Sequence, residues 1–328
     1  MATGIRIGIV GFGNIGRAVE MAVAQNPDMT VAGIFTRRGP GGVVPRYDTS
    51  KVYDIAAAEA FRDEIDVAVL CGGSATDLPE QGPFFAAIFN TVDSFDTHAR
   101  IPEYYASVDR AAKQAGTTCV ISTGWDPGLF SLMRVMGESV LPEGTSYTFW
   151  GPGLSQGHSD AIRRIAGVID ARQYTIPIEG AVDRVRSGEQ PSFTAREKHF
   201  RDCYVVAADG ADQDAIRREI TEMPHYFDEY DTKVTFISRD EMKEKHAVMP
   251  HGGFVIRTGN DDAGNKSVSE FSLKLESNPG FTASILVAYA RAAYRLSREG
   301  RTGAKTVFDI APAYLSMKGR EELIRDQL

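Results

Sequence analysis

The sequence predicts an α/β protein, with an N-terminal doubly wound parallel sheet followed by an α+β domain whose sheet is mainly antiparallel. Three observations carry this prediction. Nearly continuous apolar segments alternate with helical patterns over the first 120 residues. From about residue 123 the strands become longer and alternate polar with apolar side chains. The 328 residues are also enough for two domains.

In the first domain, five short apolar segments predict strands at residues 5–10, 30–35, 66–71, 91–95 and 117–122. The cores IGIV, VAGIF, VAVL and CVIS are typical of strands that are covered on both faces. Helical patterns separate them at 14–25, around 52–61, at 78–89 and at 102–114. Residues 39–50 begin with four glycine or proline residues and predict a surface loop.

In the second domain, residues 267–276 show the clearest alternation, with Phe271, Leu273 and Leu275 on one face. The alanine-rich segment 282–298 predicts a long helix that packs back onto the first domain. We therefore expect a dinucleotide-binding domain at 1–122 that is completed by about 279–328. Residues 123–278 form the other domain.

Composition excludes several classes of protein. The chain has 36 Lys and Arg against 44 Asp and Glu, a net charge of −8, which disfavours a nucleic-acid binder with a basic face. Apolar stretches are shorter than a membrane span needs, and the N-terminus enters a strand without a signal-peptide pattern. Three cysteines without a CxxC pair disfavour disulfides and zinc. We expect a cytoplasmic protein.

A glycine-rich turn follows the first strand. Gly11, Gly13 and Gly16 form G-x-G-x-x-G immediately after IRIGIV and before a helical pattern, the arrangement of a Rossmann dinucleotide site. The glycines permit a tight turn, a close approach of the pyrophosphate and close packing of helix on strand. The alternative is a glycine-rich turn without a ligand. The whole expected site segment is Gly11, Phe12, Gly13, Asn14, Ile15 and Gly16.

The end of the second strand bears on cofactor choice. An NAD enzyme places a carboxylate about 20 residues after the glycines to bind the ribose 2′-hydroxyl. Thr36 stands at this position, and Arg37 and Arg38 follow it. Two guanidinium groups suit a 2′-phosphate, so the sequence predicts NADP. The alternative is a solvated arginine pair in a loop.

Small residues follow another strand and lead into a helix. They would let a cofactor lie across the strand ends, and they are Cys71, Gly72, Gly73, Ser74, Ala75 and Thr76. A plain strand-to-helix turn with Asp77 as helix cap is compatible with this interpretation.

Two acidic residues lie at predicted strand ends, where open α/β sheets bind ligands. They are Asp96 and Asp126. Two carboxylates beside a nicotinamide favour a cationic substrate such as an amino acid. Alternatively, Asp126 caps a helix that starts at Pro127, while Asp93, Asp96 and His98 are solvated loop residues.

The segment 149–160, FWGPGLSQGHSD, is unusual. It contains G-x-S-x-G at 153–157, the pattern of a hydrolase nucleophile elbow, but Gly151 and Pro152 interrupt the strand that an elbow needs. A glycine-rich loop that offers backbone N–H groups to a carboxylate is favoured. His246 and His251 lie five residues apart across Pro250 and do not suit a metal site.

Taken together, several segments resemble the meso-diaminopimelate dehydrogenases over nearly the whole chain. They are IVGFGNIGR, GIFTRR, GSATDLPEQ, TVDSFDTH, STGWDPG, TFWGPGLSQGHSDAIRRI, MPHGG and NPGFTAS. The resemblance implies NADP-dependent oxidative deamination of meso-2,6-diaminopimelate at its D centre, within lysine and cell-wall precursor synthesis. The products are L-2-amino-6-oxopimelate, the open form of tetrahydrodipicolinate, and ammonia. It also implies a homodimer, with residues 123–278 serving substrate binding and dimerisation.

The resemblance assigns residues as well. Asp96 and Asp126 would lie beside the D-centre amine as catalytic and substrate-binding groups. The remaining substrate residues would be Trp125, Trp150, Gln156, Gly157, Thr175, Arg201, His251 and Asn278. The expected cofactor contacts also include Ser94, Phe95, Thr123, Gly124, Trp125 and Pro127.

Alternatives stay open for single residues and for the function. Arg201 could be a surface arginine on a strand and His251 a structural histidine. Another NADP-dependent amino-acid or semialdehyde dehydrogenase is the nearest alternative activity. A nucleotide sensor without chemistry is the alternative outside the enzymes, and the paired aspartates favour catalysis over it.

Overall fold

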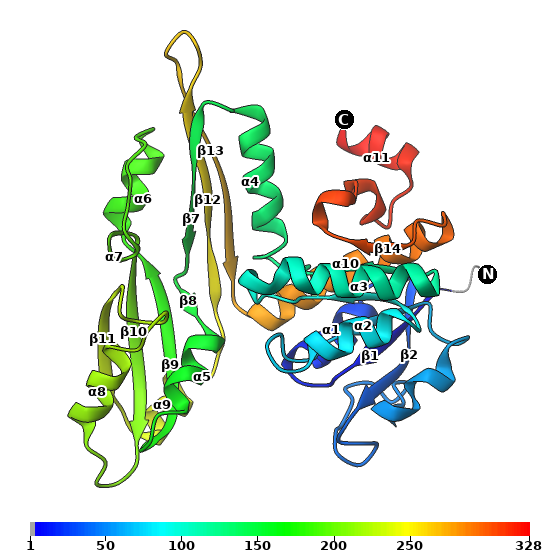
Figure 1. Ribbon diagram of the computed structural model, residues 1–328, viewed down its shortest axis with the longest axis horizontal. Helices are drawn as coiled ribbons and strands as arrows, with labels where there is room; N and C mark the ends of the chain where they lie inside the picture. The colour runs from blue at the N-terminus through cyan, green and yellow to red at the C-terminus, as the bar shows by residue number, and fades with distance from the viewer. Residues whose placement is uncertain (1–3) are drawn as a thin grey trace. The chain divides into compact units, whose positions relative to one another are not determined.

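The computed structural model describes residues 4–328, which divide into two compact units. The first unit contains residues 4–132 together with 279–328, and the second contains residues 133–278. The second unit is thus an insertion in the chain of the first, as the colour sequence in Figure 1 makes visible.

The first unit is built on a seven-stranded sheet in the order β14-β6-β5-β4-β1-β2-β3, in which every pair is parallel. Strand order reverses about β1, as in a doubly wound sheet, so the predicted fold class is confirmed. The strands are β1 (Ile5–Val10), β2 (Met29–Thr36), β3 (Val52–Asp54), β4 (Val67–Leu70), β5 (Asn90–Asp93), β6 (Thr118–Val120) and β14 (Gly303–Lys305).

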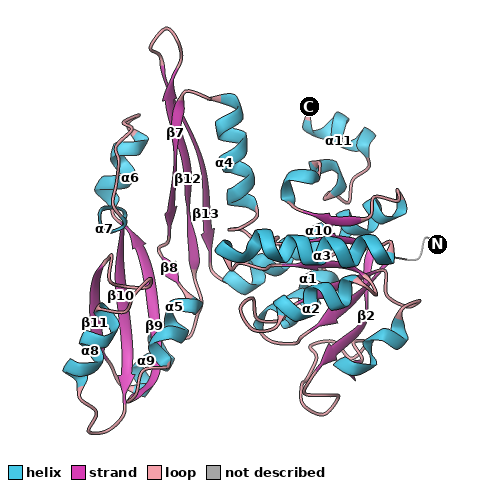
Figure 2. Cartoon of the chain, in the orientation of Figure 1, coloured by secondary structure: helices cyan, strands magenta, loops and turns pink. Residues whose placement is uncertain are grey.

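Helices connect these strands (Figure 2). Those of the first part of the chain are α1 (Asn14–Ala24), α2 (Leu78–Ala86), α3 (Ile101–Ala115) and the start of α4 (Leu129–Val140). Side chains of α2 and α3, such as Phe85 and Val108, share one buried core with Leu70 and Cys119 of the sheet region. The short turn η2 (His98–Arg100) precedes α3.

The helix predicted around 52–61 is wrong. Residues 52–54 instead form β3, which pairs with β2, and η1 (Ile55–Phe61) is a 3₁₀ helix. Two features explain the difference. The Tyr53 ring stacks on Phe35 with centroids 5.5 Å apart, and Asp54 accepts the N–H of Ala56 at 2.9 Å to start the tighter helix.

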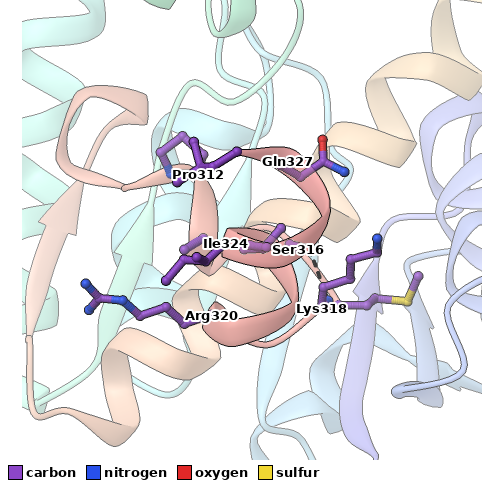
Figure 3. Close-up of a pocket in the computed structure, with 10 residues that line it drawn as sticks. Pro312, Ser316, Lys318, Arg320, Ile324 and Gln327 are labelled. Atoms are coloured by element: carbon purple, nitrogen blue, oxygen red, sulfur yellow. Dashed lines mark hydrogen bonds between the residues drawn. The ribbon is translucent and has the colours of Figure 1, made fainter.

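The C-terminal segment contributes α10 (Asn278–Arg298), β14 and α11 (Arg320–Gln327), with short turns η3 (Val307–Asp309) and η4 (Pro312–Tyr314). The buried Arg291 of α10 forms an ion pair with Asp28, and β14 extends the sheet beside β6. A cavity of about 720 Å³ lies between η4 and α11 and is lined by side chains such as Met317 and Ile324 (Figure 3).

The second unit holds two sheets. One has the order β11-β10-β9-β8 and the other β13-β12-β7, and all pairs except β10-β11 are antiparallel. The mainly antiparallel sheet was therefore predicted correctly. The strands are β7 (Gly144–Trp150), β8 (Gly153–Leu154), β9 (Val168–Pro177), β10 (His199–Ala207), β11 (Asp231–Phe236), β12 (His251–Asn260) and β13 (Lys266–Leu275).

Short helices accompany these sheets: α5 (Gln156–Arg163), α6 (Glu179–Arg186), α7 (Ala195–Lys198), α8 (Gln213–Thr221) and α9 (Arg239–Lys245). A buried cluster that includes Ile162, Cys203, Ile216 and Phe227 joins α5 and α8 to the larger sheet. Within residues 4–328, no helix combines the length and the apolar character that crossing a membrane requires.

Candidate active site

The glycine turn after β1 has the geometry that a dinucleotide requires. Gly11 has φ +90°, in the region that favours glycine, and its N–H donates to Phe35 O at 2.8 Å. A Cβ on Gly16 would lie 2.1 Å from Gly11 O, so only glycine lets α1 approach the strand this closely. A Cβ on Gly13, at the start of α1, would have no atom within 4 Å. The helix N-terminus is therefore accessible to a phosphate.

These two glycines make a matched pair of variants. We expect Gly16→Ala to destabilise the protein by about 1–3 kcal/mol or more, because the methyl group meets backbone. Gly13→Ala keeps its stability but weakens NADP binding by about tenfold, or about 1.4 kcal/mol, because the methyl group occupies the phosphate's approach. Thermal unfolding and cofactor titration measure the two effects. Equal losses of stability in both variants would contradict this assignment.

The arginine pair after β2 has a carboxylate beside it, although Thr36 stands where an NAD enzyme places one. Arg37 forms a 2.8 Å ion pair with Asp77 at the start of α2, while 71% of its side chain stays exposed. Arg38 Nη2 donates to Phe12 O at 2.6 Å, which places this guanidinium beside the glycine turn. Thr36 is buried beneath them. The position suits a 2′-phosphate, with Asp77 as a competing anion for Arg37.

A cavity of about 470 Å³ lies beside this pair. Arg37 and Thr76 line it, together with Ile55, Glu80 and Phe84. The cavity thus joins the turns after β2 and β4, which are the two turns that flank the adenosine half of a dinucleotide in this fold class.

The turn after β4 holds itself in place and contacts the next turn. The carboxylate of Asp77 accepts the N–H of Gly73 at 2.8 Å. The Asp77 side chain therefore does not cap α2, contrary to the expectation from the sequence. Ser74 Oγ accepts the N–H of Asp96 at 2.9 Å and lies 3.2 Å from Thr97 Oγ1. The exposed Asp96 is therefore fixed by its backbone while its side chain faces solvent.

Asp93 lies in the strand predicted at 91–95, and the alternative that it is a solvated loop residue is wrong. It is the last residue of β5 and fully buried. Its Oδ1 accepts the N–H groups of Phe95 at 2.9 Å and Ser122 at 3.1 Å, and its Oδ2 accepts the Tyr104 hydroxyl at 2.7 Å. Burial raises the pKa of Asp93 to about 6, against the lowering effect of these bonds.

The third strand-end turn, residues 122–128, carries the other predicted aspartate. Trp125 is 8% exposed and packs edge-on against Phe130, with centroids 5.2 Å apart. Asp126 is half-buried, and its peptide bond to Pro127 is cis. Helix α4 starts only at Leu129, so Asp126 does not cap a helix beginning at Pro127.

In the second unit, Thr175 and Arg201 are cross-strand partners on β9 and β10. Both are buried, and Arg201 Nη1 donates to Thr175 Oγ1. The guanidinium also lies over the Tyr230 ring, 3.9 Å from its centroid, while its Nε has no hydrogen-bond partner. Burial lowers the pKa of Arg201, and no carboxylate within residues 4–328 pairs with it. A buried cation in this state fits a ligand carboxylate.

His251 lies next to the same strand pair. A Cβ on Gly153, which pairs with Thr175, would lie 2.6 Å from Cγ of the His251 ring. The N–H of Gly252 lies 2.8 Å from His251 Nδ1, and Gly252 O lies 3.2 Å from the same ring nitrogen. Burial lowers the pKa of His251 and favours the neutral ring.

Two further residues support this region and were not predicted. His199 Nε2 accepts the N–H of Trp150 at 2.9 Å, and burial lowers the pKa of His199 to about 3. The Trp150 side chain itself is 36% exposed. The second of these residues is Tyr230, whose ring lies under the Arg201 guanidinium. Neither position carries a motif, so only the folded sheet reveals them.

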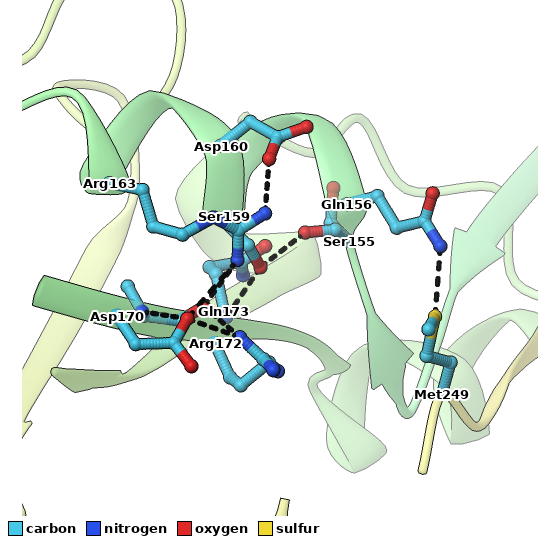
Figure 4. Close-up of polar contacts among 10 residues, drawn as sticks. Ser155, Gln156, Ser159, Asp160, Arg163, Asp170, Arg172, Gln173 and Met249 are labelled. Atoms are coloured by element: carbon cyan, nitrogen blue, oxygen red, sulfur yellow. Dashed lines mark hydrogen bonds and ion pairs between the residues drawn. The ribbon is translucent and has the colours of Figure 1, made fainter. Parts of the chain in front are cut away.

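Three of the six backbone N–H groups in the segment 151–157 donate to residues outside it. The N–H groups of Gly151, Leu154 and Ser155 donate to Gly252, Pro250 and Gln173. These three groups of the expected loop are thus not available to a carboxylate. The first turn of α5 leaves the N–H groups of Gln156 and Gly157 without intrahelical acceptors, and both residues are exposed. Gln156 Nε2 also contacts Met249 Sδ at 2.9 Å (Figure 4).

The G-x-S-x-G pattern does have a short strand, β8, before its serine and a helix after it, contrary to the expectation. Ser155 nevertheless has φ −89° and ψ 114°, ordinary extended geometry, where a nucleophile elbow holds its serine on a strained turn. Its hydroxyl lies 2.8 Å from His158 Nδ1, and the imidazole faces the rings of Tyr226 and Phe227. Within residues 4–328, no His, Cys, Asp and Glu cluster suits a metal ion.

The predicted residues therefore fall into two groups. The first unit brings the cofactor residues and both aspartates to the carboxyl ends of neighbouring parallel strands; they lie at positions 11–16, 36–38, 71–76, 94–96 and 123–127. The second unit brings Trp150, Thr175, Arg201 and His251 to adjoining strands, with Gln156 and Gly157 at the start of α5. Asn278 is the last residue of this unit, and its N–H donates to Met249 O at 3.0 Å.

Comparison with known proteins bears on this arrangement. Residues 124–277 match the model of the diaminopimelic acid dehydrogenase C-terminal domain. The meso-diaminopimelate D-dehydrogenase of Ureibacillus thermosphaericus is 62% identical over 324 residues, which are 99% of each chain. The chain belongs to the meso-diaminopimelate dehydrogenase family.

Solved structures of the meso-diaminopimelate dehydrogenase family agree. A six-fold substituted enzyme of Clostridium tetani E88, solved with diaminopimelate, is 56% identical with a TM-score of 0.94, covering 99% of this chain and 100% of that one. An engineered D-amino acid dehydrogenase bound to NADP⁺ is 45% identical with a TM-score of 0.88 and the same coverage.

Proposed function

We propose that the protein catalyses the reversible, NADP-dependent oxidative deamination of meso-2,6-diaminopimelate at its D centre, giving L-2-amino-6-oxopimelate and ammonia. The observation that carries this proposal is 62% identity over 99% of a chain with that activity in its name. Each unit supplies groups with suitable chemistry: the strand-end turns in the first unit, and in the second the buried Arg201, whose Nε has no hydrogen-bond partner. The reaction belongs to lysine and diaminopimelate biosynthesis.

The substrate's distal, L-amino acid end is assigned to Arg201, Thr175 and His251. A buried guanidinium with a free Nε gains a carboxylate without losing another partner. The Clostridium tetani protein solved with diaminopimelate is substituted at a Gln, a Thr, an Arg, a Pro, a His and an Asn. The spacing of those six positions equals that of Gln156, Thr175, Arg201, Pro250, His251 and Asn278. This correspondence supports the assigned substrate set and adds Pro250 to it.

The turns at residues 11–16, 36–38 and 71–76 hold NADP, which accepts the hydride when bound. Carboxylate side chains of the protein take up the proton. The D-centre ammonium must lose a proton before its carbon can give up hydride, and Asp96 or Asp126 accepts it. The carboxylate that remains charged stabilises the iminium that forms. Water then adds to the imine carbon, and ammonia leaves.

We also propose that the enzyme is a homodimer and acts in the cytoplasm. Support comes from the resemblance to the family and from the biosynthetic reaction. Light scattering of the purified protein tests the first statement, with a mass of one chain as the contrary result.

The deciding experiment measures NADP reduction with meso-, LL- and DD-diaminopimelate, using NAD as cofactor control. We expect activity with the meso isomer and NADP. Activity with none of the isomers despite tight NADP binding would overturn the substrate and leave another amino-acid or semialdehyde dehydrogenase. An absence of turnover with every amino acid and semialdehyde tried would favour a nucleotide sensor.

The arginine pair gives a prediction on the cofactor. Replacing Arg37 and Arg38 by alanine should raise the KM for NADP by about 10–100-fold, the loss of one or two charge-assisted hydrogen bonds to a phosphate. The KM for NAD should change little, since it lacks the 2′-phosphate. Steady-state kinetics with both cofactors measure this, and equal changes would contradict the assignment.

A further inference from the structure

Asp93 is a buried carboxylate that the reaction described above does not use. It has no exposed surface, so it cannot touch substrate or cofactor. Burying an ionisable side chain is costly, and an apolar residue would serve a purely structural strand end at lower cost. Its three side-chain hydrogen bonds offset part of that cost, and two of them run to other elements, at Ser122 and Tyr104. The role of Asp93 therefore depends on which segments these hydrogen bonds connect.

The carboxylate joins two of the strand-end turns. Oδ1 accepts the N–H of Phe95 in its own turn and the N–H of Ser122 in the turn after β6. Its backbone O accepts both the N–H of Thr123 at 2.9 Å and the Thr123 hydroxyl at 2.8 Å. Ser122 has φ +55°, a left-handed conformation that is unfavourable for serine and needs such support.

The two turns are those of the predicted catalytic groups. Asp96 directly follows Phe95, and Trp125 and Asp126 follow Thr123 by two and three residues. Tyr104 of α3 holds the other carboxylate oxygen and stacks on Phe95, with centroids 4.1 Å apart. Both oxygens of the Asp93 carboxylate are thus held by hydrogen bonds. The position of Asp93 therefore fixes the turn after β5 and the turn after β6 together.

We propose that Asp93 is a positioning residue of the deamination reaction, which fixes the turn of Asp96 and the turn of Trp125 and Asp126 relative to each other. This inference rests on the proposed function for its kinetic part. The geometric requirement is strict, because a displacement of about 1 Å in a reacting group can cost about 10²-fold in rate.

The test compares three variants. Asp93→Ala removes the acceptor and should lower kcat by about 10²-fold, with the KM for NADP changed less than about threefold. Asp93→Asn keeps an oxygen for the two N–H groups and should restore kcat to within about fivefold of the parent. Asp109→Ala is the control: Asp109 also accepts a backbone N–H, that of Ala304, and pairs with Lys113, but it anchors β14 instead of the two turns. Its kcat should remain near that of the parent.

A second readout does not depend on turnover. The chain has two tryptophans, so a Trp150→Phe background leaves Trp125 as the only one, and its emission reports on the turn after β6. Trp125 is buried, so we expect a red shift in Asp93→Ala and none in Asp93→Asn or Asp109→Ala. A parent without activity on meso-diaminopimelate would overturn the proposed function, while the emission comparison would still decide whether Asp93 fixes the turn.

Should Asp93→Ala fail to fold, Tyr104→Phe decides. It removes only the hydroxyl that donates to Oδ2 and keeps the ring stacked on Phe95. We expect a fall in kcat of about five- to tenfold, less than in Asp93→Ala because the two N–H bonds to Oδ1 remain, and a smaller red shift of Trp125. Unchanged kcat and emission in this variant, or effects in Asp93→Ala that equal those of Asp109→Ala, would overturn the proposal.

Discussion

Asp126→Asn is expected to lower kcat with meso-diaminopimelate by about 10²–10⁴-fold, the range that a positioned proton acceptor contributes. The amide keeps the size of the side chain but cannot take the ammonium proton. The Kd for NADP, measured by titration, should stay within about twofold. Asp126 is half-buried at a strand end, so the substitution should also leave thermal stability nearly unchanged.

Two comparisons sharpen this prediction. Asp96→Asn tests the other candidate, and the aspartate that transfers the proton is the one whose substitution causes the larger fall in kcat. Asp63→Asn, an exposed aspartate away from the strand ends, is the control and should match the parent. Turnover near the parent value in Asp126→Asn would remove Asp126 from the mechanism.

Arg201→Met is expected to lower kcat/KM for meso-diaminopimelate by about 10²–10³-fold, because the substrate carboxylate loses a buried, charge-assisted partner worth about 3–4 kcal/mol. Most of the loss should appear in KM, since this end of the substrate does not react. Stability should stay constant or rise. Burial already lowers the pKa of Arg201, which shows that the site disfavours its charge, and methionine removes that charge.

Arg217→Met provides a surface control beside the same sheet. Arg217 lies on α8 and is exposed; it donates to Val234 O on β11, and its guanidinium lies over the Phe236 ring. It is not assigned to the substrate, and its variant should keep kcat/KM within about threefold. Similar kinetics for the two arginine variants would refute the role of Arg201 as the carboxylate ligand.

The sequence predicted the features that depend on neighbouring residues. The glycine turn at 11–16 follows from six consecutive positions, and the apolar cores of the strands follow from local periodicity. Contacts between distant residues were not accessible in this way. Arg37 meets Asp77 forty positions later, and Ser122 donates to Asp93 across two strands.

Short elements were the other source of error. Residues 52–54 form three residues of strand because β2 offers a free edge there, and 303–305 form β14 because β6 does. Neither segment is long enough for a periodic pattern. The burial of Asp93 was not accessible from the sequence either. An aspartate near a strand end looks solvated until α3, whose Tyr104 donates to its carboxylate, is known.

The insertion of the second unit between the two parts of the first has a consequence for synthesis. Because β14 and Arg291 belong to residues 279–328, the nucleotide-binding sheet lacks an edge strand and the partner of Asp28 until the ribosome has made about the last sixth of the chain. Residues 133–278 are complete earlier and hold their own buried cores. The N-terminal part therefore remains incompletely folded while the inserted unit is translated. During that interval the edge of β6 can pair with strands of other chains. A high demand for chaperones during translation follows from this order of chain growth, and ribosome-bound chains ending before residue 300 would reveal it as protease-sensitive N-terminal segments.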